Sequence, residues 1–205
     1  MTAAEPVRVG VVGGGMWATD LHIPLHRSPG STVLSGVWVR SAEVRQRLRD
    51  TGIPVTESYD ALLDDCEAVD FAVPPTAQAD LACRAAEAGR HVMLEKPSAL
   101  DPADAQRIAD AVARAGVVST MLLTRRFHPT VRSRLRDIAA QGGRALGVQG
   151  AHVHGGLLAG GFVADASTWR HELGLIVDLG PHLLDLGEEL AGPIAEVRVR
   201  EHDGW

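Results

Sequence analysis

Short apolar runs alternate with amphipathic stretches over the first 124 residues of the chain. The runs have the length of strands and end at glycine, proline or charged residues, which is typical of strands buried on both faces. They predict strands at 7–12, 33–39, 53–56, 68–73, 91–94 and 117–123. Helical spacing of apolar residues predicts helices from Met16 and over 41–50, 58–65, 78–88 and 101–115. Because strands and helices alternate, we predict an α/β fold with a doubly wound parallel sheet.

Local signals mark several helix ends in this region. Ser58 and Asp101 suit N-cap positions, Pro102 suits the first helical turn, and Gly116 suits a C-terminal stop. Pro24 lies late in the helix that begins at Met16, and we predict that it ends or kinks that helix.

The pattern is less regular after residue 124. It predicts a helix at 130–140, a strand at 145–154, a loop at 155–167, a helix from 181 to about 190 and a last strand at 195–201. His152 and His154 would share one face of the first of these strands and could line a substrate cleft. A zinc pair is the weaker alternative, since no third ligand follows at a recognisable spacing.

A glycine-rich turn follows the first predicted strand. Written as G-x-G-x-x-A, it consists of Gly13, Gly15 and Ala18. In such a turn the first glycine permits the tight bend, the second lets the backbone approach a pyrophosphate, and the third small residue lets the helix pack closely. The helix that follows would offer its N-terminal N–H groups to the phosphates. This arrangement predicts a dinucleotide site.

The end of the second strand bears on the choice of dinucleotide. NAD sites usually carry an acidic residue there to bind the ribose 2′-hydroxyl, but this chain has Arg40 and Ser41. Both could bind a 2′-phosphate, so NADP is preferred and NAD remains possible. In the alternative interpretation Arg40 is merely solvated and Glu43 or another group selects the cofactor.

Lys96 is the only lysine in a chain that has nineteen arginines. A lysine ammonium is a compact charge on a flexible stem, which arginine cannot replace at every site. Gly13, Arg40, Pro74 and Lys96 each follow a predicted strand. Since ligands of doubly wound sheets bind beyond the carboxyl ends of the strands, these residues should share one edge with the cofactor.

Composition excludes several other classes of protein. The chain has 205 residues, 45% of them hydrophobic, and a formal net charge of −6 without a basic stripe, so no nucleic-acid partner is predicted. Cys66 and Cys83 match no metal or disulfide spacing. No apolar run approaches the roughly 20 residues that span a membrane, and the first residues do not form a signal peptide. We expect a cytoplasmic protein.

Five motifs occur in the order found in the Gfo/Idh/MocA oxidoreductases, and the chain resembles that family over nearly its whole length. The motifs are Gly13-Gly14-Gly15-Met16-Trp17-Ala18, His22-Ile23-Pro24, Glu95-Lys96-Pro97, Arg125-Arg126-Phe127-His128-Pro129 and Asp178-Leu179-Gly180-Pro181-His182-Leu183-Leu184-Asp185. The resemblance implies a Rossmann domain at 1–124. It also implies a second domain at 125–205 for substrate binding or oligomerisation, built on an open sheet. Because family members are substantially longer, we expect a truncated α+β domain with a partial sheet.

The resemblance implies hydride transfer between NAD(P) and a sugar, polyol or related alcohol, with a homo-oligomer possible. Lys96, Asp178 and His182 would form the catalytic set, and the Lys96–Pro97 peptide bond would be cis. The residues implied at the cofactor are Gly13, Gly15, Met16, Trp17, Arg40, Ser41, Pro74, Glu95 and Lys96. The candidate substrate contacts are His152, His154, Arg126 and Trp169. Gln78 stands where relatives often carry histidine, which bears on contacts at the nicotinamide.

Other interpretations stay open. Without the family pattern, Asp178 reads as a helix cap and His182 as a core residue. Trp169 suits packing better than stacking on a substrate, and both stay open. The short second domain also leaves two alternatives to a complete enzyme. The chain could be a non-catalytic NADP(H)-binding module, or it could be a fragment of a longer dehydrogenase.

Overall fold

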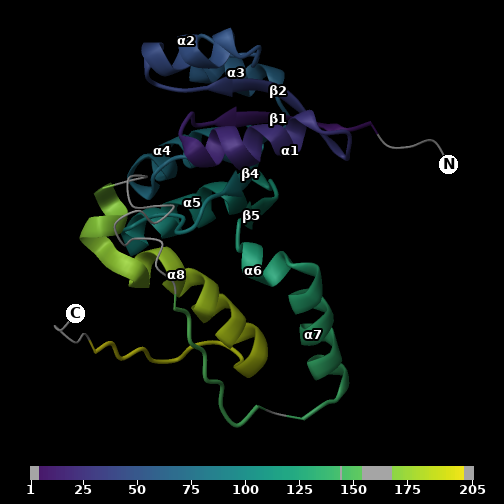
Figure 1. Ribbon diagram of the computed structural model, residues 1–205, viewed down its shortest axis with the longest axis vertical. Helices are drawn as coiled ribbons and strands as arrows, with labels where there is room; N and C mark the ends of the chain where they lie inside the picture. Colours follow the sequence, from purple (N-terminus) through teal and green to yellow (C-terminus); the bar gives the residue numbers. More distant parts are fainter. Residues whose placement is uncertain (1–4, 144, 154–167, 201–205) are drawn as a thin grey trace. The chain divides into compact units, whose positions relative to one another are not determined.

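The computed structural model describes residues 5–143, 145–153 and 168–200 (Figure 1). The chain divides into two compact units, an N-terminal unit, Met1–Leu122, and a C-terminal unit, Leu123–Trp205.

A parallel sheet with strand order β2-β1-β3-β4-β5 forms the centre of the N-terminal unit. The strands are β1 (Val7–Val12), β2 (Thr32–Trp38), β3 (Ala68–Phe71), β4 (His91–Leu94) and β5 (Ser119–Met121). The order reverses at β1, since β2 lies on one side of it and β3 on the other. This reversal creates the crevice in which doubly wound sheets bind ligands. The predicted parallel sheet is therefore confirmed.

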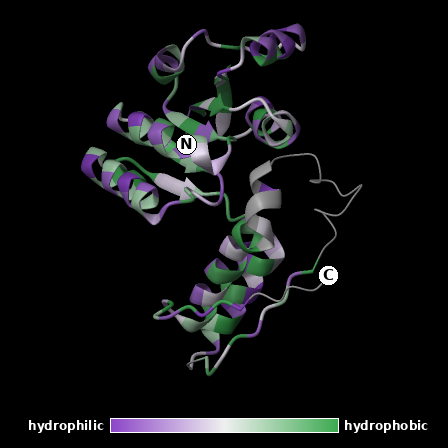
Figure 2. Ribbon diagram, turned by 90° about the vertical axis from the view of Figure 1, so that its left-hand side faces the viewer, coloured by the Kyte–Doolittle hydropathy of each residue, from purple (hydrophilic) through white to green (hydrophobic). Residues whose placement is uncertain are grey.

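The helices of this unit connect the strands. They are η1 (Ala18–His22), α1 (Ile23–Arg27), α2 (Ala42–Asp50), α3 (Tyr59–Asp65), α4 (Pro75–Glu87) and α5 (Pro102–Ala115). The predicted caps are confirmed, because the side chains of Ser58 and Asp101 accept backbone N–H bonds and Gly116 ends α5 at φ 66°. Apolar and polar residues alternate around these helices (Figure 2), so each helix can bury one side against the sheet.

The core consists of two clusters. Val11 and Val12 are neighbours in β1 but pack into different clusters, because successive strand residues point to opposite faces of a sheet. One cluster includes Val11, Ala18, Ile23, Val37 and Leu48. The larger one includes Val12, Leu62, Val69, Phe71, Ala82 and Ile108. Both faces of the sheet are therefore covered, as the apolar runs predicted.

One prediction for the N-terminal unit is decided between its alternatives, and another needs correction. Pro24, predicted to end or kink its helix, does not end it, because the helix continues to Arg27. A wide π-helical turn, in which the Ile23 N–H bonds to the Ala18 carbonyl, precedes the proline and accommodates the missing N–H of its ring. The strand predicted at 53–56 is reduced to one parallel bridge between Val37 and Val55.

The regular secondary structure described in the C-terminal unit is helical. It contains α6 (Thr124–Phe127), α7 (Pro129–Ala140) and α8 (Thr168–Ala191). Arg126 of α6 binds the Asp185 carboxylate of α8 through Nε and Nη2, and its Nη1 contacts Glu189. Such a bidentate pair is strong and directional, and it fixes α6 on α8.

The strands predicted at 145–154 and 195–201 are wrong for the described residues, because 145–153 and 192–200 have no regular secondary structure. A strand needs a neighbour to take its backbone hydrogen bonds, and the described part of this unit offers none. The predicted loop at 155–167 lies outside the described residues. The helix predicted from Pro181 begins earlier, because Pro181 lies inside the second of two helical segments that α8 joins across a kink at Gly174, which has φ 67°. Within the described residues, no helix is long and apolar enough to cross a membrane.

Candidate cofactor and catalytic site

The sequence-predicted residues of the N-terminal unit follow the carboxyl ends of neighbouring strands. Gly13 follows β1, Arg40 lies two residues beyond β2, Pro74 precedes α4 beyond β3, and Glu95 follows β4 directly. These strands are hydrogen-bonded neighbours in one parallel sheet. The fold therefore brings residues from four separate stretches of sequence to the same edge.

The glycine turn has the space that a ligand backbone contact requires. Gly13 has φ 136°, and a Cβ added there would come within 2.3 Å of the Ala72 carbonyl oxygen. A Cβ at Gly15 would meet no atom within 4 Å. Met16 and Trp17 then open the helix with exposed side chains. The residues fit a bound pyrophosphate, because the backbone at Gly15 faces open space at the start of a helix.

Two arginines of α2 bind the backbone of the turns that follow β1 and β2, and sequence reasoning did not single them out. Arg45 Nη1 donates to the carbonyl oxygens of Val39 and Arg40, at 2.8 and 3.0 Å. Arg47 Nη2 donates to the Gly14 carbonyl at 3.0 Å, 33 residues away in sequence. The exposed Arg40 thus has the positive charge of Arg45 at its carbonyl group. The Ser41 hydroxyl accepts the Val44 N–H and caps α2.

The turn that contains Lys96 is held by Gln78, a fully buried residue of α4. Its Nε2 donates to the carbonyls of Glu95 and Ser98, each at 2.9 Å, and its Oε1 accepts the Glu95 N–H at 2.9 Å. The Lys96–Pro97 peptide bond is cis, as the family resemblance implied. Gln78 therefore supports the backbone of the candidate catalytic turn, a role that the sequence did not indicate.

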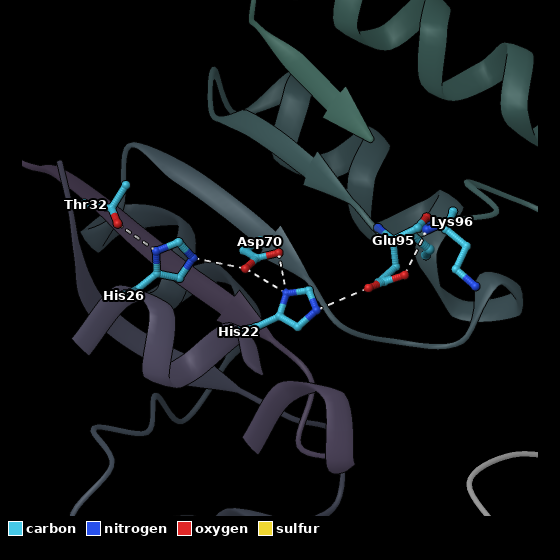
Figure 3. Close-up of polar contacts among 7 residues, drawn as sticks. His22, His26, Thr32, Asp70, Glu95 and Lys96 are labelled. Carbon is cyan, nitrogen blue, oxygen red and sulfur yellow. Dashed lines mark hydrogen bonds and ion pairs between the residues drawn. The ribbon is translucent and has the colours of Figure 1, made fainter. Parts of the chain in front are cut away.

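A buried polar chain leads from the sheet to the same turn (Figure 3). Asp70 of β3 is fully buried, and His22 and His26 are only 1% and 3% exposed. Asp70 contacts His22 Nδ1 at 2.9 Å and His26 Nε2 at 3.0 Å, and Thr32 Oγ1 lies 2.9 Å from His26 Nδ1. His22 Nε2 lies 3.3 Å from Glu95 Oε1. A carboxylate inside an apolar strand was the sequence signal that could have revealed this chain.

The charges of Asp70, His22 and Glu95 in this buried hydrogen-bonded path stabilise one another. Burial alone would lower the pKa of His22, but hydrogen bonds to Asp70 and Glu95, together with their charges, raise it to about 9. Burial alone would raise the pKa of Asp70, but hydrogen bonds from His22 and His26 lower it. His22 is therefore an imidazolium and Asp70 a carboxylate at neutral pH.

The remaining predicted residues belong to the C-terminal unit. Asp178 and His182 lie four residues apart on α8, with exposed fractions of 5% and 7%. Asp178 lies four residues after the kink at Gly174, within the second of the two helical segments that α8 joins. Arg170 Nε donates to Asp178 Oδ1 at 3.0 Å. Lys96 belongs to the other unit, so the structure describes the two parts of the predicted catalytic set separately.

The structure describes two of the candidate substrate contacts and leaves the others outside its described part. Arg126 is engaged with Asp185 and Glu189, and these hydrogen bonds raise its pKa further. His152 is half-buried, and its Nε2 lies 3.3 Å from Arg125 Nη2. His154 and the side chain of Trp169 lie outside the described part. Among residues 5–143, 145–153 and 168–200, no cluster of three or more His, Cys, Asp or Glu could hold a metal ion.

Known proteins resemble the chain in sequence. A model of an oxidoreductase family with an NAD-binding Rossmann fold, Gfo/Idh/MocA, matches residues 7–122. The dTDP-3,4-didehydro-2,6-dideoxy-alpha-D-glucose 3-reductase of Streptomyces violaceoruber is 31% identical over 95% of this chain and 56% of its own length. An uncharacterized oxidoreductase of Rhizobium meliloti is 33% identical over 85% of this chain and 53% of its own length.

Solved structures resemble it too. An NAD-binding protein from Listeria innocua has a TM-score of 0.66 and 26% identity, covering 88% of this chain and 53% of that one. A 3-ketoreductase from Actinomadura kijaniata, solved with NADP and TDP-benzene, has a TM-score of 0.58 and 29% identity, covering 67% of this chain and 43% of that one. The chain spans about half the length of these proteins.

Proposed function

Because the chain belongs to the Gfo/Idh/MocA oxidoreductase family, we propose that it moves a hydride between NADP and a secondary alcohol or ketone of a sugar, polyol or related substrate. The observation that carries the proposal is the position of Lys96. The only lysine of the chain follows β4 at the cofactor edge of the sheet, in a turn whose backbone Gln78 holds. A fixed backbone at this point limits where the ammonium can lie, and a pre-positioned charge can meet a reacting oxygen without costly rearrangement.

The residues that would hold the dinucleotide follow from the geometry of the edge. The backbone from Gly13 to Trp17 would bind the pyrophosphate, and Arg40, Ser41 and Arg47 would surround the adenosine ribose. Since no acidic side chain ends β2, a ribose 2′-phosphate would meet positive charge, which favours NADP over NAD. The nicotinamide supplies the hydride chemistry.

The chain's own residues would handle the proton and the developing charge. His182 takes the proton of the substrate hydroxyl, because imidazole titrates near neutral pH. The Lys96 ammonium donates a hydrogen bond to the same oxygen and stabilises the alkoxide. Asp178, oriented by Arg170, binds a neighbouring hydroxyl and favours the charged form of His182.

One observation favours a second candidate. The chain spans about half the length of the relatives, and a substrate cleft needs two walls. The chain by itself could therefore be a cofactor-binding module, or a part whose activity depends on further residues. Both alternatives keep the dinucleotide site and lose turnover.

The test separates binding from chemistry. NADPH and NADH are titrated by cofactor fluorescence, and turnover is then measured with sugars, polyols and a dTDP-linked keto sugar. We expect NADPH to bind at least about tenfold more tightly, a difference of about 1.4 kcal/mol. Lys96→Met should keep NADPH binding and lose turnover, and Lys96→Arg tests whether charge alone suffices. Binding without turnover in the unmodified chain would favour the module, and normal turnover in Lys96→Met would refute the mechanism.

A further inference from the structure

We propose that His22 and Asp70 are positioning residues for Lys96, acting through the Glu95 carboxylate that they hold against the start of the lysine turn. The contacts form one unbroken path (Figure 3). Asp70 binds His22, His22 binds Glu95 Oε1, and Glu95 Oε2 accepts the backbone N–H of Lys96 at 3.1 Å. The path joins η1, β3 and the turn after β4, whose residues are 48 and 73 positions apart from His22.

The geometry determines the protonation state of His22. Each of its two ring nitrogens faces a carboxylate, Asp70 at Nδ1 and Glu95 at Nε2. An ionised carboxylate only accepts hydrogen bonds, so both nitrogens must donate and the ring carries a positive charge. Without that charge, two carboxylates would face a neutral ring that can donate to only one of them.

Asp70 acts as the anchor of the path. It is fully buried, and it also binds His26, whose other nitrogen contacts Thr32. A buried carboxylate with several donors has little freedom to move. The charged and titratable groups that face His22 in the described part of the chain are Asp70 from β3 and Glu95 from the turn, with His26 on the far side of Asp70.

Glu95 transmits the constraint to the lysine. Its backbone N–H and carbonyl are both bound by Gln78, so its main chain is fixed from α4, while its side chain is fixed from η1. The side chain of Lys96 extends away from the His22 ring (Figure 3). The path therefore acts on the backbone from which the ammonium projects. Displacement of a reacting group by about 1 Å can reduce a rate roughly 100-fold.

The first measurement is an NMR titration of the full chain labelled at the histidine rings. Loss of one resonance in His22→Gln assigns His22. We expect both of its ring nitrogens to carry protons at neutral pH, and we expect the pKa of the ring to fall by about one unit or more in Glu95→Gln, because one carboxylate partner is removed. A His22 ring that is neutral at pH 7, or that ignores Glu95→Gln, would overturn the proposal.

The second measurement uses the single lysine. A chain labelled with 15N-lysine gives one backbone amide signal, that of Lys96. We expect this signal to shift when His22 loses its proton, and to shift in His22→Gln and Glu95→Ala. His91→Gln is the matched control, since His91 is an exposed residue of β4 outside the path. If His22→Gln does not fold, Glu95→Gln gives the same information, because the Glu95 side chain is 19% exposed. A Lys96 amide that does not follow His22 would refute the positioning role.

The proposal rests on the proposed function only for the importance of Lys96, and the two can fail separately. With a sugar or polyol that the chain turns over, Glu95→Gln should lower kcat about 100-fold, a larger effect than any change in the NADPH dissociation constant. Coupled NMR signals in a chain without turnover would support the positioning path and contradict the proposed function. Turnover in a chain whose Lys96 amide signal does not follow His22 would support the proposed function and contradict the positioning path.

Discussion

The stability of the N-terminal unit should fall as pH rises from about 6 to about 9, because of His22. Its pKa is about 9 in the folded chain, against 6.5 for an unperturbed histidine ring. The folded state holds the proton more tightly, so the contribution is fully present below the unfolded pKa and is lost as pH rises through the folded one. Over this window the loss amounts to about 3 kcal/mol, at 1.36 kcal/mol for each pKa unit.

The assay is urea unfolding followed by far-ultraviolet circular dichroism at several pH values between about 6 and 9. The free energy of unfolding of the unmodified chain should decrease steadily, whereas His22→Gln should be less stable at neutral pH and much less sensitive to pH. Burial also raises the pKa values of Cys66 and Cys83, so these thiols lose protons more readily in the unfolded chain, which lowers stability at the alkaline end. Both chains share that contribution, so the difference between them isolates His22.

His91→Gln is again the control and should follow the unmodified chain. Parallel pH profiles for the unmodified chain and His22→Gln would show that the His22 proton is not coupled to folding, and the reasoning would be wrong. At acid pH the contribution of Asp70 to the stability of the fold has the opposite pH dependence. Its pKa is lowered, so its contribution is present above its unfolded pKa of roughly 4 and is lost as pH falls through the lower folded value.

Three further substitutions test the cofactor edge. Gly13→Ala should abolish NADPH binding, because φ 136° is strained for alanine and its Cβ would meet a backbone carbonyl at 2.3 Å; unchanged affinity in a fluorescence titration would contradict the tight turn. Gln78→Leu should destabilise the chain by roughly 2–4 kcal/mol, since it leaves buried backbone groups without partners; urea unfolding measures this, and a loss under about 0.5 kcal/mol would argue against Gln78 as the support of the turn. Arg47→Ala should weaken NADPH binding several-fold more than NADH binding, whereas the exposed Arg114→Ala on α5 should affect neither; equal losses for both cofactors would remove Arg47 from the 2′-phosphate site.

The sequence by itself determined most of the N-terminal unit, because the signals involved are local. Apolar runs marked the five sheet strands, and their alternation with helices implied the parallel order. Ser58 and Asp101 indicated helix starts through side chains that bond to N–H groups two or three residues away. The order of the short motifs pointed to the family and to Lys96 before any contact was known.

Tertiary structure decided the features that depend on residues distant in sequence. No local pattern joins His22 to Asp70 or Gln78 to Glu95, since each pair meets only when the sheet has formed. The same reason explains the wrong strands at 145–154 and 195–201, where apolar alternation was present but the described part of the unit has no partner strand. An alternating apolar pattern predicts which side chains of a strand would share a face. The strand itself forms only where a neighbouring strand can pair with its backbone hydrogen-bonding groups.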